Sequence, residues 1–236
     1  ELEFEAPKYD ADHNEIVYTV VEAEVEGYTT EISGNQTEGF VITNTEKPND
    51  EKIKIRVDKR WLGKVAGEIT VSVLKGDIPY ATKTVTASAI KNGDLNTWEM
   101  TFDDLPKYDT AGKEIVYTVT EEPIANYDSV ITGNAANGFT VTNTNTEKTS
   151  VDVTKTWVGT PAASVTIKLF ADGIEKETVT LTAADNWTHT FANLDKYAAD
   201  GHEIVYTVDE TPVTNYTKAI SGDAANGFTI TNTITG

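Results

Sequence analysis

The six residues Glu114-Ile-Val-Tyr-Thr-Val119 occur twice more in the chain, at residues 15–20 and 203–208. β-Branched and aromatic residues dominate this run and no glycine or proline interrupts it, so it predicts a buried or half-buried β-strand. Because alternate residues of a strand share a face, the residue two positions after each run lies on the same face as its tyrosine. In all three copies that residue is a glutamate: Glu22, Glu121 and Glu210.

Two further motifs show that the chain is built from repeats. One keeps the spacing of the glutamates and occurs three times, as Phe40-Val-Ile-Thr-Asn44, Phe139-Thr-Val-Thr-Asn143 and Phe228-Thr-Ile-Thr-Asn232. The other, K-x-W, occurs only at residues 59–61 and 155–157. Self-similarity at such a period is typical of repeat architectures. We therefore predict an incomplete repeat at residues 1–47, which lacks the K-x-W strand, and complete repeats at 48–147 and 148–236.

The pattern within each repeat indicates the fold class. Apolar and polar residues alternate at 69–74 and 164–170, turn dipeptides such as Asn92-Gly93 separate the short runs, and no segment has a helical period. About seven short strands in each complete repeat predict an all-β fold of tandem antiparallel β-sandwich domains of Ig-like type. The connections between repeats are too short for flexible tethers, so we expect the domains to lie end to end as a rod.

Composition limits the classes of function. The 236 residues include no cysteine, which excludes disulfides, and 38 acidic against 19 basic residues give a net charge of −19. This charge disfavours nucleic acid and anionic membranes as partners, and no apolar run is long enough to insert into a membrane. We expect no cofactor and no metal, since residues 10–14 lack the glycine and glutamate of a calcium loop. The three histidines do not recur at matched positions, which argues against a catalytic triad.

Lysine and asparagine occupy faces that should point into the core. Lys59 shares a face with Val57 and Trp61, and Asn143 shares one with Phe139 and Val141. The third repeat has the same arrangement around Lys155 and Asn232. Single lysines and glutamates in strands are usually solvated, and they are rarely buried unless paired. Their recurrence with an asparagine in two repeats indicates a common buried site.

The K-x-W opening, the Y-x-x-x-E strand and the F-x-[VI]-T-N-T close together resemble the Cna B-type repeats of Gram-positive collagen adhesins, related surface proteins and pilins. This resemblance implies a spontaneous isopeptide bond in each complete repeat, Lys59 to Asn143 and Lys155 to Asn232, with loss of ammonia. Glu121 and Glu210 would relay the protons. An apolar environment supports this chemistry because it lowers the pKa of a lysine toward the neutral nucleophile.

The first repeat carries Glu22 and Asn44 without a matching lysine. Its missing half either lies outside this sequence or is supplied by another chain through strand complementation. Apart from this, the expected partners are neighbouring repeats of the same protein, and no host ligand is identified.

The resemblance also implies a function. It points to a structural stalk of an extracellular, cell-wall-anchored bacterial adhesin, which is not an enzyme beyond its own single-turnover cross-linking. Two alternatives remain, namely a backbone module of a pilin and a β-sandwich that binds a host matrix protein or glycan.

Overall fold

The computed structural model describes residues 2–47 and 49–235, which form two compact units. The first unit contains the described residues of 1–52 together with 106–115, and the second contains those of 53–105 and 116–236. Pro48, in the predicted boundary after the first repeat, lies outside the described residues, as do the terminal positions Glu1 and Gly236.

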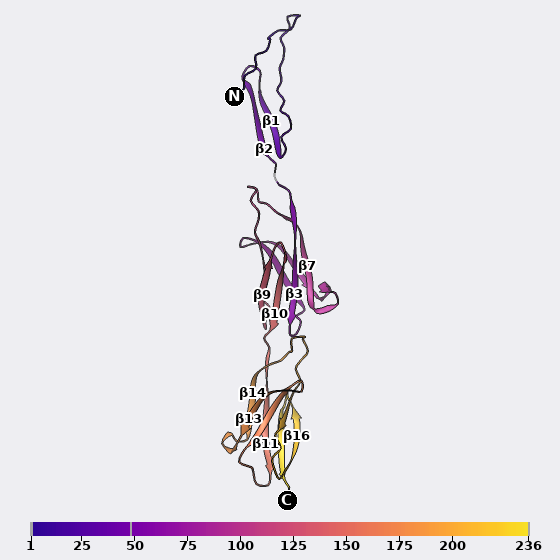
Figure 1. The fold of residues 1–236 in the computed structure, drawn as a ribbon, viewed down its shortest axis with the longest axis vertical. Helices are drawn as coiled ribbons and strands as arrows, with labels where there is room; N and C mark the ends of the chain where they lie inside the picture. The colour runs from indigo at the N-terminus through magenta and orange to yellow at the C-terminus, as the bar shows by residue number, and fades with distance from the viewer. Residues whose placement is uncertain (1, 48, 236) are drawn as a thin grey trace. The chain divides into compact units, whose positions relative to one another are not determined.

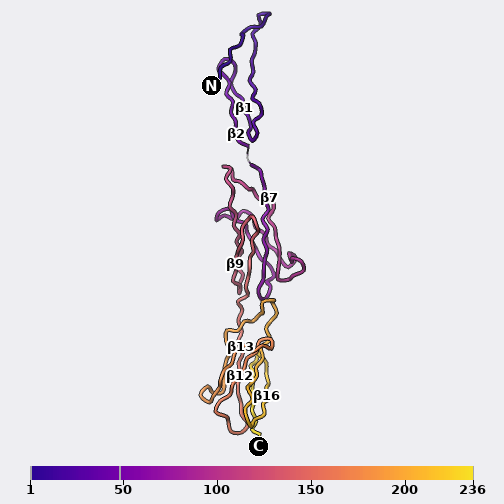
Figure 2. The backbone as a smooth tube through the Cα atoms, viewed as in Figure 1, coloured from indigo at the N-terminus to yellow at the C-terminus, as the bar shows by residue number. Residues whose placement is uncertain are grey.

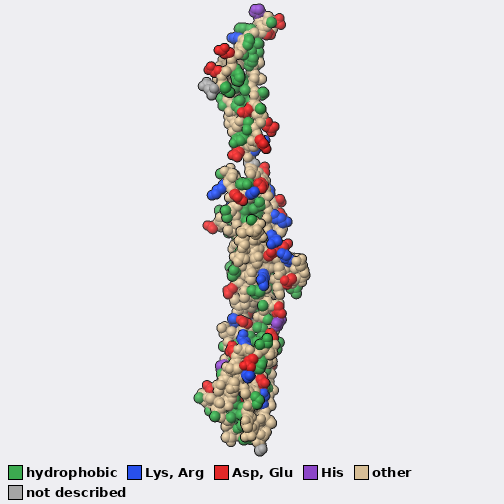
Figure 3. Space-filling view, viewed as in Figure 1, with side chains coloured by type: hydrophobic (Ala, Val, Ile, Leu, Met, Phe, Trp, Pro, Cys, Tyr) green, Lys and Arg blue, Asp and Glu red, His purple; other side chains and the backbone are tan. Residues whose placement is uncertain are grey.

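The first unit contains one antiparallel hairpin, β1 (Tyr28–Asn35) and β2 (Gly39–Glu46). The prediction of a strand at residues 15–20 is wrong for this repeat, because only an isolated bridge between Tyr9 and Glu15 forms there. In the complete repeats the equivalent run pairs with a strand that the first repeat lacks. Without that partner Tyr18 is 37% exposed, whereas its equivalents Tyr117 and Tyr206 are 3% and 4% exposed. Figure 3 shows hydrophobic side chains open to solvent on the visible face of this unit.

The second unit begins with a two-sheet sandwich that corresponds to the second repeat. One sheet has the strand order β6 (Ile90–Lys91), β7 (Asp94–Pro106), β3 (Lys52–Leu62), β10 (Gly138–Asn145) and β9 (Tyr127–Asn134). The other has the order β5 (Ile78–Thr86), β4 (Glu68–Lys75) and β8 (Tyr117–Glu121). Figure 1 shows β3, β9 and β10 beside one another, as this order requires.

The third repeat forms a second sandwich, whose backbone can be followed in Figure 2. Its sheets have the orders β14 (Thr188–Asp195), β11 (Lys148–Val158), β17 (Gly227–Ile234), β16 (Tyr216–Asp223), and β13 (Ile174–Leu181), β12 (Val165–Ala171), β15 (Tyr206–Glu210). The helices of the described residues are two short 3-10 turns, η1 (Ala87–Ala89) and η2 (Ala183–Asp185). Neither is long and apolar enough to cross a membrane. The prediction of all-β tandem sandwiches is confirmed.

One strand pair in each sandwich is parallel, which the expectation of an antiparallel fold did not include. β3 runs parallel to β10, and β11 runs parallel to β17. In the third repeat the cause is the strand count, since successive strands reverse direction and the first and seventh therefore point the same way. The opening and closing strands of each complete repeat thus lie side by side within one sheet.

The cores follow the predicted alternation. In β3 the buried residues are Ile55, Val57, Lys59 and Trp61, so the lysine occupies a core position within an apolar row. Tyr117, Tyr206 and Trp98 are buried as expected, and Trp187 is partly buried against the core of the third repeat.

A tight hairpin fixes the register of the closing strand. Gly133 has φ +99°, and a Cβ there would lie 2.2 Å from the carbonyl oxygen of Gly138, so only glycine fits this position. Asn134 Oδ1 accepts the backbone N–H groups of Ala136 and Asn137, both at 3.0 Å. The turn sets Asn143 directly opposite Ser129 on β9.

Candidate cross-link sites

The second repeat brings its predicted site residues together from three strands. β3 supplies Lys59, β8 supplies Glu121 and β10 supplies Asn143. Lys59 and Asn143 are each 0% exposed, and the side chain of Glu121 is 2% exposed. Lys59 Nζ lies 3.1 Å from Glu121 Oε1. In the parallel register Asn143 pairs with Trp61, two positions after Lys59, so the lysine and the asparagine are diagonal neighbours on one face.

The third repeat assembles the same three residue types and adds a hydrogen bond between the asparagine and the glutamate. Lys155, Glu210 and Asn232 are 3%, 2% and 1% exposed. Lys155 Nζ lies 3.5 Å from Glu210 Oε2, and Asn232 Nδ2 donates a hydrogen bond of 2.7 Å to Glu210 Oε1. The carboxyl group therefore contacts the amine and the amide at once. Lys155 Nζ also donates to the carbonyl oxygens of Thr156 at 3.0 Å and Ile230 at 3.2 Å.

Burial changes the protonation of both lysines. Removal from water lowers the pKa of Lys59 from 10.5 to about 8, although the charge and hydrogen bonding of Glu121 partly oppose the change. The pKa of Lys155 is also lowered by burial, again opposed by its glutamate, Glu210. A lysine with a lowered pKa offers more of the neutral, nucleophilic amine near neutral pH.

Aromatic rings line the lysine side of each site. Lys59 Nζ lies 4.4 Å from the centre of the Trp61 ring, and Lys155 Nζ lies 4.2 Å from that of Trp157. Trp61 in turn packs edge-to-face on Trp98, with ring centroids 5.2 Å apart. The K-x-W spacing explains the contact, because residues two apart on a strand share a face. These rings cover the amine with apolar surface and hold it by a cation–π contact when it is charged.

The first repeat brings Glu22 and Asn44 to a common neighbour. Thr30 Oγ1 lies 3.0 Å from Glu22 Oε2 and 2.7 Å from Asn44 Oδ1. Thr30 and Asn44 are exposed, and Glu22 is half-buried. The glutamate and the asparagine therefore lie near each other in this repeat too, although the sequence provides it with no K-x-W strand.

Two residues that sequence reasoning missed also touch the sites. Ser129 Oγ donates to Glu121 Oε2 at 2.9 Å, and Lys218 Nζ donates to the backbone oxygen of Glu210 at 3.0 Å. Both lie directly opposite the asparagine of their repeat. The sequence could have identified them from the hairpin turn that ends in Asn-Gly. Each asparagine lies five residues after the glycine of the turn, and its partner lies five residues before the residue paired with that glycine.

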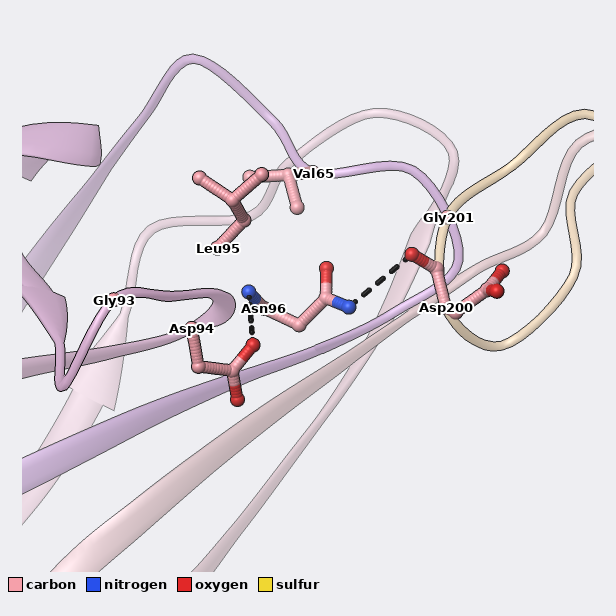
Figure 4. A pocket seen from close by; sticks show the side chains of 7 residues that line it. All are labelled: Val65, Gly93, Asp94, Leu95, Asn96, Asp200 and Gly201. Carbon is pink, nitrogen blue, oxygen red and sulfur yellow. Dashed lines mark hydrogen bonds between the residues drawn. The ribbon is translucent and has the colours of Figure 1, made fainter.

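A shallow pocket in the second unit contains none of these residues (Figure 4). It is lined by Val65, Gly93, Asp94, Leu95, Asn96, Asp200 and Gly201. Asn96 donates its backbone N–H to Asp94 Oδ1 at 2.9 Å and its Nδ2 to the backbone oxygen of Asp200 at 3.2 Å. The second of these bonds links the second repeat to the third.

Comparison with known proteins identifies the family. The model of the Cna protein B-type domain matches residues 2–45, 55–144 and 151–233. The collagen adhesin of Staphylococcus aureus is 34% identical over 94% of this chain, which spans 19% of that protein's length. A crystal structure of two B repeat units of the collagen binding protein of Staphylococcus aureus is 32% identical, with 96% of this chain and 61% of that chain covered and a TM-score of 0.43.

A second structure, a single B repeat unit of the same collagen binding surface protein, is 33% identical. It covers 79% of this chain and 100% of that chain, with a TM-score of 0.36. The family model accounts for most of the sequence and agrees with the motifs found in it, so the chain belongs to the Cna protein B-type domain family.

Proposed function

We propose that this chain is a structural spacer of a bacterial surface adhesin, in which isopeptide bonds reinforce the complete repeats. It would consist of an incomplete repeat at 1–47 and complete repeats at 48–147 and 148–236. The observation that carries the proposal is the burial of a lysine, a glutamate and an asparagine together in both complete sandwiches. Kinship with a collagen binding surface protein supports an extracellular, cell-wall-anchored location.

The proposed reaction balances without a cofactor. The neutral Nζ of the lysine attacks Cγ of the asparagine, so that an Nζ–Cγ bond forms, the Cγ–Nδ2 bond breaks and ammonia leaves. The glutamic acid gives a proton to the leaving nitrogen and takes one from the attacking amine, so it ends as it began. Lys59 would join Asn143, and Lys155 would join Asn232. Each site reacts once, which makes the chain its own substrate rather than an enzyme.

The geometry supports this chemistry in two ways. Burial supplies the neutral amine, since it lowers the pKa of Lys59 to about 8. The folded strands also hold amine and amide together, and such positioning replaces a high concentration of free reactants. The contact of Glu210 with both Lys155 and Asn232 matches what a proton relay requires.

Intact mass tests the proposal. The purified chain should weigh less than its sequence by the mass of two ammonia molecules. Glu121→Gln and Glu210→Gln keep the shape of the side chain but remove its acid, so each should restore one ammonia and the double variant should have the full mass. A wild-type chain of full mass would refute the cross-links.

The first repeat gives the proposal an intermolecular extension. Glu22 and Asn44 are held at Thr30, and a K-x-W strand from outside residues 1–47 would complete this site as β3 and β11 do in the others. A synthetic peptide with the sequence of residues 52–62 should form a covalent adduct with the chain, again with loss of one ammonia. The same peptide with alanine in place of its Lys59 is the control, and equal labelling by both would contradict strand complementation.

A further inference from the structure

The residue that faces the asparagine on the neighbouring strand differs among the three repeats. It is Thr30 opposite Asn44 in the first, Ser129 opposite Asn143 in the second, and Lys218 opposite Asn232 in the third. Directly opposed residues of an antiparallel pair have side chains on the same face and within contact distance. This position therefore lies beside the proposed reaction in each complete repeat.

In the second repeat, this residue occupies one oxygen of the glutamate. Ser129 Oγ donates to Glu121 Oε2 at 2.9 Å, while Oε1 lies 3.1 Å from Lys59 Nζ. The carboxyl group is thus divided between the nucleophile and the serine. Neither side-chain atom of the Asn143 amide has a hydrogen-bond partner among the described residues.

In the third repeat, the corresponding side chain turns away from the carboxyl group. Lys218 Nζ forms an ion pair with Asp209 and donates to the backbone oxygen of Glu210 at 3.0 Å. Asp209 replaces Thr120 of the second repeat, so the lysine and its acidic partner occur together. Both carboxyl oxygens of Glu210 stay within the site, one near Lys155 and the other bonded to Asn232.

We propose that this edge-strand position is a positioning residue that sets the rate of cross-linking, with Ser129 slowing the bond of the second repeat relative to that of the third. The inference rests on the proposed isopeptide bonds. It adds that their rate is controlled by a residue outside the lysine, glutamate and asparagine motifs. Ser129 and Lys218 do not touch the bond-forming atoms of lysine or asparagine and act through the glutamate.

Two physical effects give the direction. A relay must contact both the amine that loses a proton and the amide nitrogen that gains one, and the serine withdraws one oxygen from that task. A hydroxyl that donates to a carboxylate also stabilises the ionised form, whereas the relay needs the acid. In the third repeat the relay contacts are already present.

The rates can be measured one site at a time. Asn232→Ala leaves the second repeat as the reacting one, and Asn143→Ala leaves the third. Each chain is made by cell-free synthesis, quenched in acidic denaturant at intervals and weighed to follow the loss of ammonia. The double variant Asn143→Ala, Asn232→Ala can form neither bond. The time at which it becomes resistant to protease therefore measures folding alone, and the cross-linking rates are corrected for this delay.

We expect the third repeat to react faster than the second, and Ser129→Ala to accelerate the second about fivefold, the factor that corresponds to one ordinary hydrogen bond. Ser129→Thr keeps the hydroxyl donor and should retain the wild-type rate. Acceleration in the alanine variant alone would assign the effect to the hydrogen bond rather than to a change in packing. Lys218→Ser should slow the third repeat by a similar factor.

Unchanged or slower reaction of Ser129→Ala would overturn the positioning role while leaving the bonds themselves established. Loss of ammonia from none of these chains would instead refute the proposed bonds, and this inference with them.

Discussion

Lys59 Nζ and Glu121 Oε1 lie 3.1 Å apart inside a β-sandwich, with side chains that are 0% and 2% exposed. Such a pair can exist as ammonium and carboxylate or as amine and carboxylic acid, and both states hold the same number of protons. Burial disfavours the charged state, because two ions lose their hydration for one mutual attraction. The pair can thus reach the reactive neutral state by a proton transfer within itself.

This shared proton predicts how cross-linking of the second repeat depends on pH. Burial lowers the pKa of Lys59 to about 8, so the pair loses its proton as the pH rises through that value. Above it the amine is neutral but no acid remains, and the rate should fall about tenfold for each further pH unit. The measurement is the rate of ammonia loss by Asn232→Ala across the neutral and alkaline range. A rate that keeps rising well above pH 8 would show that the amine alone limits the reaction.

Removal of a cross-link should lower stability substantially. The loop from Lys59 to Asn143 holds about 80 residues, and closing a loop of this size contributes roughly 4–5 kcal/mol in the chain-entropy model developed for disulfides. We expect chemical denaturation to report a loss of this order for Asn143→Ala, which leaves the buried lysine–glutamate pair in place.

Glu121→Gln is the matched variant, because it blocks the bond while disrupting the ion pair. Similar losses in both variants would assign the effect to the cross-link. A loss confined to Glu121→Gln would assign it to the buried charge of Lys59.

Much of the fold and of the site could be predicted because strand alternation is a local property. The row of Val57, Lys59 and Trp61 is inward-facing in the structure, as the spacing of two requires. The same rule placed Glu121 and Asn143 on inward faces, and the three repeats supplied the register that one copy would have left open. The trio was therefore visible as a pattern before any contact was known.

The remaining features depend on partners that the sequence does not specify locally. The run at 15–20 has the same six residues as the runs at 114–119 and 203–208 but forms no strand. Those runs pair with β4 and β12, and the described residues of 1–47 contain no equivalent of either strand. The parallel pairs follow from the number of direction reversals in a whole domain. Ser129 and Lys218 occupy equivalent positions, yet the direction of each side chain depends on whether Thr120 or Asp209 is its neighbour.

His202 gives the third repeat a pH-dependent contact. Its Nδ1 lies 2.5 Å from Asp200 Oδ1 and its Nε2 lies 3.0 Å from Asp172 Oδ2, and these two carboxylates raise the pKa of the imidazole. Since the folded pKa is raised, the stabilisation is complete below the ordinary value of about 6.5 and is lost as the pH rises through the folded pKa. Asp172→Asn removes one carboxylate and should lower the pKa of His202 in an NMR titration.

The matching stability experiment compares melting temperatures at two pH values. The wild-type chain should lose more stability than Asp172→Asn between pH 5.5 and 8, by an amount kept small by the solvent exposure of this histidine. Equal pH dependence in the two chains would show that the bridge to Asp172 contributes nothing.

Mechanical loading should separate the cross-linked chain from its variants most clearly. Because β3 and β10 run parallel, the chain enters the second repeat at one end of this strand pair and leaves it at the other. A Lys59–Asn143 bond would carry force directly between the two strands and leave the residues between them unloaded. Single-molecule extension of the wild-type chain should therefore show no unfolding step from either complete repeat. Glu121→Gln should release about 80 residues in one step, an extension of roughly 280 Å at 3.3–3.6 Å per residue.

Glu210→Gln provides the matched comparison for this measurement. The loop from Lys155 to Asn232 is seven residues shorter than that from Lys59 to Asn143. The step released by the third repeat should therefore be shorter by roughly 24 Å, and the double variant should show both steps. The two step lengths therefore identify which repeat has lost its bond. Full-length steps in the wild-type chain would mean that the load is not carried by a covalent link between the opening and closing strands.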